Sequence, residues 1–92
     1  MKAIWKGTVL AESDDTVLVE GDHYFPAAAV KQQHLLPSNS KSMSWKGEAT
    51  YYTVFVDGDA NPDAAWTHAS PKDEAAEIRG RIAFRRGVQV VP

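Results

Sequence analysis

The chain has 92 residues, 43% of them hydrophobic and 24% charged, with a net charge of −2 and no cysteine. This length and composition fit one globular domain with a thin core, so we interpret residues 1–92 as a single domain. The missing cysteines exclude disulfides and thiolate zinc sites. The small negative charge gives no overall attraction to nucleic acid or anionic membrane, so we expect neither as a partner.

The N-terminal part of the chain has the pattern of short strands separated by turns. Two runs rich in β-branched residues, 8–11 and 16–20, flank the segment 12–15, whose residues are typical of turns. We expect the two runs to form a hairpin. A second turn at 21–22 and a short strand at 23–25 follow.

The middle of the chain changes character twice. Pro26 followed by three alanines predicts one or two helical turns over 26–33. The serine-rich segment 38–44 is the most loop-like part of the sequence. Residues 48–56 form the strongest predicted strand, and because both of its faces are largely apolar we expect it to be central and covered on both sides.

The C-terminal part alternates again between strands and turns. We expect a turn at 57–62, a returning strand at 63–68, and a short helix over 70–80 with serine as its cap and proline at its first position. A last hairpin would join 81–85 to 88–91. The predicted fold class is therefore mostly β, with two antiparallel sheets and one or two short helices.

The side chains that could bind metal do not form a convincing site. Acidic and amide residues over 57–63 have the spacing of a calcium loop, but Pro62 and His68 stand where that loop needs glycine and glutamate. The histidines lack zinc-site spacing, so we expect no metal and no cofactor. For acid–base chemistry the candidate catalytic residue is His68, because imidazole titrates near neutral pH.

Aromatic side chains gather in the segments 45–52 and 64–66, which hold two tryptophans, two tyrosines and Lys46. Such rings can stack on a flat ligand or hold a cation, and a neighbouring lysine can pair with an anionic group. The alternative is that Trp45 and Trp66 are the two core anchors of a small β domain. Both roles stay open, because a pocket is often the uncovered edge of a core.

The segments 10–13, 20–26, 45–52 and 64–66, together with Pro71, resemble the family catalogued as domain of unknown function 427. The resemblance runs in order over essentially the whole chain. It implies a β-tent, in which two antiparallel sheets pack at an angle, here without the four-cysteine zinc of related tents. It also implies a pocket between the sheets near the Trp-Lys-Gly motif.

Two features of the chain differ from the family pattern. The usual Cys-Pro before Trp-Lys-Gly is Met43-Ser44 here, and His68 stands where an aromatic residue commonly follows the second tryptophan. The family has been labelled nucleotidyltransferase-like, but the chain shows no phosphate cradle beside paired carboxylates. Whether the chain is an enzyme is therefore open.

Our preferred hypothesis is a cytoplasmic β-tent domain that binds a small molecule in a partly aromatic pocket, as a monomer or homodimer. The alternatives are an enzyme of unknown reaction that uses the same pocket, and a protein-interaction module. The candidate ligand-binding residues comprise three aromatic walls, one anion contact and two polar contacts: Trp45, Tyr52 and Trp66; Lys46; His68 and Arg81.

Overall fold

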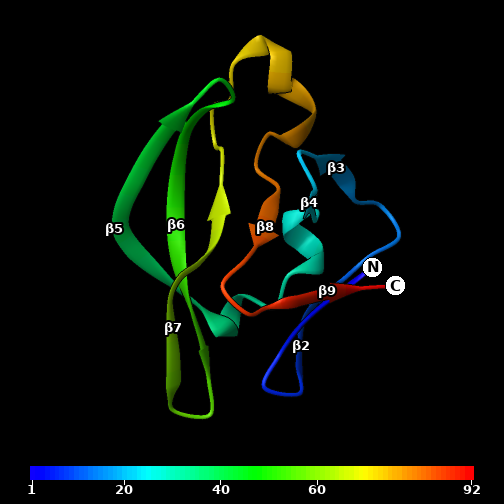
Figure 1. Cartoon of the computed structure of the whole chain (residues 1–92), viewed down its shortest axis with the longest axis vertical. Helices are drawn as coiled ribbons and strands as arrows, with labels where there is room; N and C mark the ends of the chain where they lie inside the picture. The colour runs from blue at the N-terminus through cyan, green and yellow to red at the C-terminus, as the bar shows by residue number, and fades with distance from the viewer.

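The computed structural model describes residues 1–92 and confirms a mostly β fold built from antiparallel strands. The largest sheet has the strand order β5-β6-β7-β8 and extends along the long axis of the molecule (Figure 1). Its strands are β5 (Leu35–Ser44), β6 (Gly47–Val56), β7 (Asp59–Thr67) and β8 (Ile82–Phe84). The predicted strongest strand is thus central, between β5 and β7.

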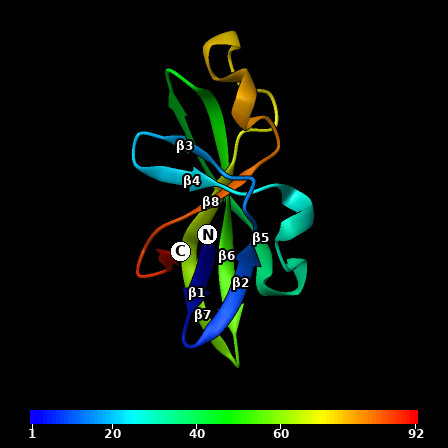
Figure 2. The same cartoon turned by 90° about the vertical axis from the view of Figure 1, so that its right-hand side faces the viewer.

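Two smaller sheets accompany the large one, so the fold has three sheets, whereas the sequence predicted two. The three-stranded sheet has the order β2-β1-β9, formed by β2 (Thr8–Glu12), β1 (Lys2–Trp5) and β9 (Gln89–Val91). The third sheet is a hairpin of β3 (Val17–Val19) and β4 (Asp22–Tyr24). Figure 2 shows this hairpin crossing the middle of the molecule, with β1 and β2 below it.

The predicted hairpin between 8–11 and 16–20 is wrong. β2 pairs with β1, and β3 pairs with β4. The turns that decide this pairing are Lys6-Gly7 and Glu20-Gly21, whose four residues all have positive φ. Two-residue turns of this kind match the twist of antiparallel strands and favour glycine at the second position. These two turns therefore determine which strands pair, and the acidic segment 12–15 does not form a hairpin turn.

The segment 38–44, predicted as a loop, belongs to strand β5. Four consecutive residues of this strand pair with the start of β6, from Lys41 opposite Thr50 to Ser44 opposite Gly47. The register shifts between Pro37 and Lys41. Proline and an irregular register are tolerated here because β5 is an edge strand. Pairing with β6, whose own strand propensity is high, overrides the weak propensity of the serines.

The predicted C-terminal hairpin is also wrong. β8 pairs with β7, whereas β9 pairs with β1 in the other sheet. The turn between them, at Arg86-Gly87, carries the chain from one sheet to the next. The predicted turn at 57–62 is likewise shorter, because β6 and β7 are joined directly by Asp57-Gly58.

The helical segments are short 3₁₀ turns. They are η1 (Ala27–Ala29), η2 (Gln32–His34) and η3 (Asp73–Ile78). The predicted serine cap is absent, since the residue before η3 is Lys72 and it makes no side-chain capping bond. None of these segments has the length and apolar character that a membrane-crossing helix requires.

The buried side chains form two clusters, one of thirteen residues and one of six. The larger packs the three-stranded sheet, through residues such as Leu10, against Val54 and Phe84 of the large sheet. The smaller gathers Tyr24 of β4 and Trp66 of β7 with residues of β6, β8 and η3. Backbone bonds between Phe25 and Ile82, of 2.8 and 2.9 Å, join the β3–β4 hairpin to β8 beside this second cluster.

Candidate functional site

A cavity of about 210 Å³ lies where the β3–β4 hairpin faces the large sheet. Only three of its eleven lining residues are hydrophobic, so the cavity is more polar than the aromatic pocket that the sequence predicted. The lining residues come from β4, β5, β6 and β7 and from the segments that follow β5, β7 and β8: Asp22, Ser42, Ser44, Lys46, Ala49, Tyr51, Asp63, Trp66, His68, Arg85 and Arg86.

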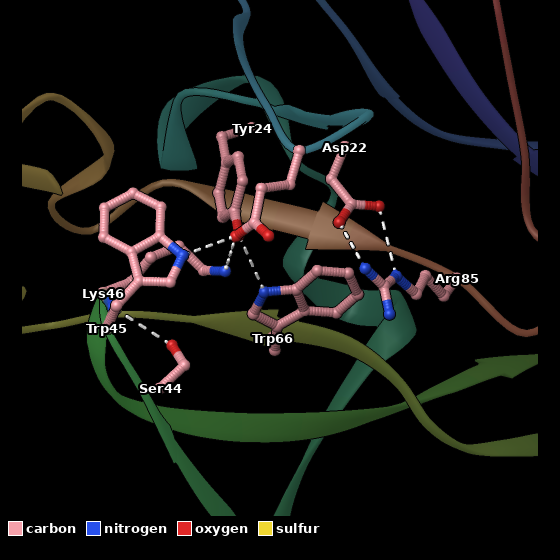
Figure 3. A network of polar contacts seen from close by, with 8 residues as sticks. Asp22, Tyr24, Ser44, Trp45, Lys46, Trp66 and Arg85 are labelled. Carbon is pink, nitrogen blue, oxygen red and sulfur yellow. Dashed lines mark hydrogen bonds and ion pairs between the residues drawn. The ribbon is translucent and has the colours of Figure 1, made fainter.

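One edge of the cavity is held by Glu20, at the turn between β3 and β4. Its Oε1 accepts hydrogen bonds from Trp45 Nε1 at 2.8 Å and from Lys46 Nζ at 2.7 Å (Figure 3). The bond from Lys46, followed by that from Trp45, lowers the pKa of the Glu20 carboxyl below its ordinary value. Two segments that carry the family resemblance, the one with Trp45 and Lys46 and the one with Glu20, are therefore in contact in the folded chain.

Trp66 forms the apolar floor of the cavity and is only 7% exposed. Its Nε1 donates to the Tyr24 hydroxyl at 3.2 Å, and the two rings pack edge to face with centroids 6.2 Å apart. The Arg85 guanidinium lies 5.0 Å from the Trp66 ring centroid. Arg85 thus supplies a cation–π contact from within the chain, so this part of the indole is not free for a cationic guest.

Of the remaining charged side chains of the cavity, some have a close polar partner and one does not. Arg85 forms two bonds to the Asp22 carboxylate, with Nη2 to Oδ2 at 2.6 Å, and this pairing raises the pKa of Arg85. Asp63 accepts a bond from the Ser40 hydroxyl at 2.7 Å. Arg86, which is exposed, is the one cation of the lining that forms no close ion pair. Its charge nevertheless acts on Asp63: hydrogen bonding to Ser38 and then Ser40 lowers the pKa of the Asp63 carboxyl, and the Arg86 charge lowers it further.

His68 is the most unusual residue of the lining. It is 1% exposed, and its Nδ1 lies 3.1 Å from the backbone oxygen of Glu48. Burial is the main cause that lowers the pKa of His68, and the nearby Lys46 charge lowers it further against the opposing effect of the Glu48 carbonyl. The imidazole is therefore neutral at pH 7. Its Nε2 is buried and has no hydrogen-bond partner in the chain.

The tautomer of His68 follows from these contacts. A carbonyl oxygen only accepts hydrogen bonds, so the proton of the neutral ring must be on Nδ1. Nε2 then carries a lone pair and acts as an acceptor. An acceptor that is buried without a partner is costly, and such exceptions in folded proteins call for an explanation.

Three of the six predicted ligand-binding residues line the cavity, namely Lys46, Trp66 and His68. The other three lie outside the lining. Trp45 is 49% exposed and contacts Glu20, so it is not a second core anchor. Tyr52 packs against the larger core cluster, and Arg81 donates to the backbone oxygen of Asp15 at 2.7 Å.

Sequence reasoning did not include the arginines and the acidic partner of the cavity among the candidate site residues. Arg85 was expected to end a strand, and Arg86 to lie in the turn, of a hairpin that does not form, so the position of Arg85 beside Trp66 could not be foreseen. The available signal was the segment Glu20-Gly21-Asp22, a turn that brings two carboxylates to one end of a hairpin. That turn supplies the partners of Lys46 and Arg85.

Fold and site together define a small mostly β domain with a polar cavity over an aromatic floor. The model of the family described as a domain of unknown function (DUF427) matches residues 1–91. The chain belongs to this family, as its motifs predicted. Among curated proteins no match was found.

Proposed function

We propose that this domain binds a small polar molecule in the cavity between the β3–β4 hairpin and the large sheet. The observation that carries the proposal is His68, a neutral and buried side chain whose Nε2 acceptor is unpartnered in a residue that lines the cavity. Nε2 itself is not accessible to solvent, so a ligand would have to displace neighbouring side chains to donate a hydrogen bond to it and remove the cost of the unpaired acceptor.

The character of the lining supports a polar ligand over a flat apolar one. Arg85 already lies against Trp66, and Trp45 is turned to Glu20, so few aromatic surfaces are left for stacking. Hydroxyl, carboxylate and guanidinium groups make up most of the wall. Pockets of this kind orient a ligand by a few polar contacts.

An enzyme that uses the same cavity is the second candidate, and it depends on the same nitrogen. A neutral imidazole with a free Nε2 is the form that a general base requires. The lowered pKa would keep this form available below neutral pH. The enzyme hypothesis adds a turnover requirement: a bound compound must be converted, and the rate must fall as His68 becomes protonated.

A thermal-shift screen of the purified protein against small polar metabolites tests the proposal. Compounds that bind the folded state raise the melting temperature in a saturable way. The variant Ser42→Phe places a large ring at an exposed position of the lining and should abolish the shift. Its matched control is Lys41→Phe, the exposed neighbour on the same strand that does not line the cavity.

The two variants give the screen a clear outcome. Shifts that persist in Lys41→Phe and disappear in Ser42→Phe place the binding in the cavity. Shifts that are equal in both variants would place it elsewhere on the domain and contradict the proposal. No saturable shift from any compound would contradict it as well, and would favour the protein-interaction alternative.

A further inference from the structure

We infer that the tip of the β3–β4 hairpin, residues 16–23, is a lid over the cavity that opens as a unit while the rest of the domain stays folded. Two ion pairs, Glu20 with Lys46 and Asp22 with Arg85, hold this lid closed. The opening itself needs no ligand. Its role in admitting a ligand to the cavity rests on the proposed function.

The base of the hairpin is fixed to the rest of the domain at both of its strands. Just before β3, the backbone oxygen of Asp15 accepts a hydrogen bond from Arg81 Nη1 at 2.7 Å. Just after β4, Phe25 and Ile82 exchange two backbone hydrogen bonds of 2.8 and 2.9 Å. Tyr24 and Phe25 are also fully buried. These contacts anchor the two ends of the tip, so a hinge would lie beside them.

The tip beyond this base contains no fully buried residue. Val17 and Val19 are half-buried against the smaller core cluster, whereas Leu18 between them is 61% exposed. Thr16 Oγ1 and His23 Nδ1 lie 3.0 Å apart and join the two strands to each other, so the tip can move as one piece. A two-stranded hairpin is only marginally stable by itself, and segments with few buried apolar contacts open at a lower free energy than the core.

The hydrogen bonds that join the tip to the large sheet all end on two carboxylates (Figure 3). Glu20 accepts from Trp45 and Lys46, and Asp22 accepts from Arg85. Each ion pair has one well-exposed partner, since the side chains of Glu20 and Arg85 are 53% and 63% exposed. Solvent and mobile ions screen such pairs, so each holds the lid only weakly and in a salt-dependent way.

Opening of the lid would widen the cavity without dismantling its wall. Asp22 is the only lining residue that belongs to the tip, and the others lie on strands of the large sheet or on the segments that follow them. The floor residue Trp66 keeps its hydrogen bond to Tyr24, because Tyr24 belongs to the base. The lid therefore controls access to a preformed wall, and a ligand that contacts both Asp22 and the large sheet would hold it closed.

Amide hydrogen exchange of the unmodified protein, followed by NMR at low urea concentrations, tests the lid. An amide that is freed by local opening exchanges with little dependence on urea, whereas an amide that is freed only by global unfolding follows the full urea dependence. The hydrogen-bonded amides of β3 and β4 should exchange at least about tenfold faster than those of the central strand β6, with one shared free energy of opening. Equal rates and equal urea slopes for the two groups would overturn the inference.

The variants Glu20→Gln and Asp22→Asn test the ion pairs that hold the lid. Each keeps the size of the side chain but removes its charge, so the amides of β3 and β4 should exchange about threefold faster. The matched control is Asp59→Asn, which removes the carboxylate of an ion pair with Lys6 at the β6–β7 turn, outside the hairpin. This control should leave the exchange of the hairpin unchanged. Exchange in Glu20→Gln and Asp22→Asn that is no faster than in Asp59→Asn would overturn the role of the two ion pairs.

The failure of this inference can be told apart from the failure of the proposed function. If the hairpin exchanges only with global unfolding, but compounds still raise the melting temperature of Lys41→Phe and not that of Ser42→Phe, the lid is wrong and the binding function stands. If the hairpin opens separately and no compound binds, the local opening is confirmed and the binding function is wrong.

Discussion

Replacement of Trp66 by alanine tests whether the floor of the cavity is also a principal support of the fold. The side chain is 7% exposed, packs edge to face on Tyr24, and donates its only N–H to the Tyr24 hydroxyl at 3.2 Å. Truncation of a buried tryptophan to alanine costs about 3–5 kcal/mol. A domain of 92 residues has a total stability of about 5–14 kcal/mol, so the variant should be near its folding threshold.

The variant Trp66→Phe divides this cost into two parts. Phenylalanine keeps an aromatic ring against Tyr24 but removes the N–H, so this step should cost about 1–2 kcal/mol through the lost hydrogen bond and the smaller ring. The remaining difference between Trp66→Phe and Trp66→Ala reports the packing. Tyr24→Phe, which leaves the buried indole N–H without an acceptor, should cost about 1–3 kcal/mol.

Urea unfolding followed by circular dichroism measures these differences without relying on the deleted fluorophore. With an m-value of about 1–3 kcal/mol/M, the midpoint of Trp66→Ala should fall by at least about 1 M. The control is Trp45→Ala, since Trp45 is 49% exposed and its truncation should cost about 1 kcal/mol or less. A Trp66→Ala variant as stable as Trp45→Ala would refute the assignment of Trp66 to the core.

Two further predictions concern stability. Because burial lowers the pKa of His68 in the folded state, the unfolded chain takes up a proton first as the pH falls below about 6.5, and stability should decline there by at most about 1.4 kcal/mol per pH unit. In His68→Asn the free energy of unfolding should decline less as the pH falls. Urea midpoints measured from pH 7.5 to 5 test this. If the variant and the unmodified protein lose stability equally with falling pH, the assignment of a neutral imidazole is contradicted. Gly47→Ala should destabilise more than Gly58→Ala: both have positive φ, but only at Gly47 would a Cβ approach another backbone atom, Lys72 N at 3.3 Å. Equal midpoints for the two alanine variants in the same urea assay would contradict the close approach.

The features of the fold that the sequence predicted are those encoded by neighbouring residues. Strand β6 was recognised because its β-branched and aromatic residues are consecutive, and the turns near Gly21 and Gly58 because glycine favours positive φ. The errors all concern pairing between segments. β5 is a strand because β6 provides its hydrogen bonds, and β9 leaves β8 because β1 offers a free edge. Such choices depend on the assembled sheet, which local propensity does not describe.

The candidate site shows the same division. Lys46, Trp66 and His68 were singled out from their chemistry, and all three line the cavity. Arg85 and the carboxylates of the β3–β4 hairpin were not singled out, because they come close to these residues only when the hairpin packs against the large sheet. The unpaired Nε2 of His68 is likewise invisible in the sequence, since it depends on a backbone carbonyl twenty residues away in the chain.

The departure from the family's Cys-Pro pattern can now be located. Met43 is 69% exposed and does not line the cavity, whereas its neighbours Ser42 and Ser44 do, as expected from the alternation of side chains along β5. A cysteine at position 43 would therefore also lie outside the cavity. Position 44 is different, because serine adds a hydroxyl to the lining and its Oγ accepts a bond from the Lys46 backbone N–H at 3.1 Å. The exchange that changes the chemistry of the site is thus serine for proline, next to the lysine that secures the β3–β4 hairpin.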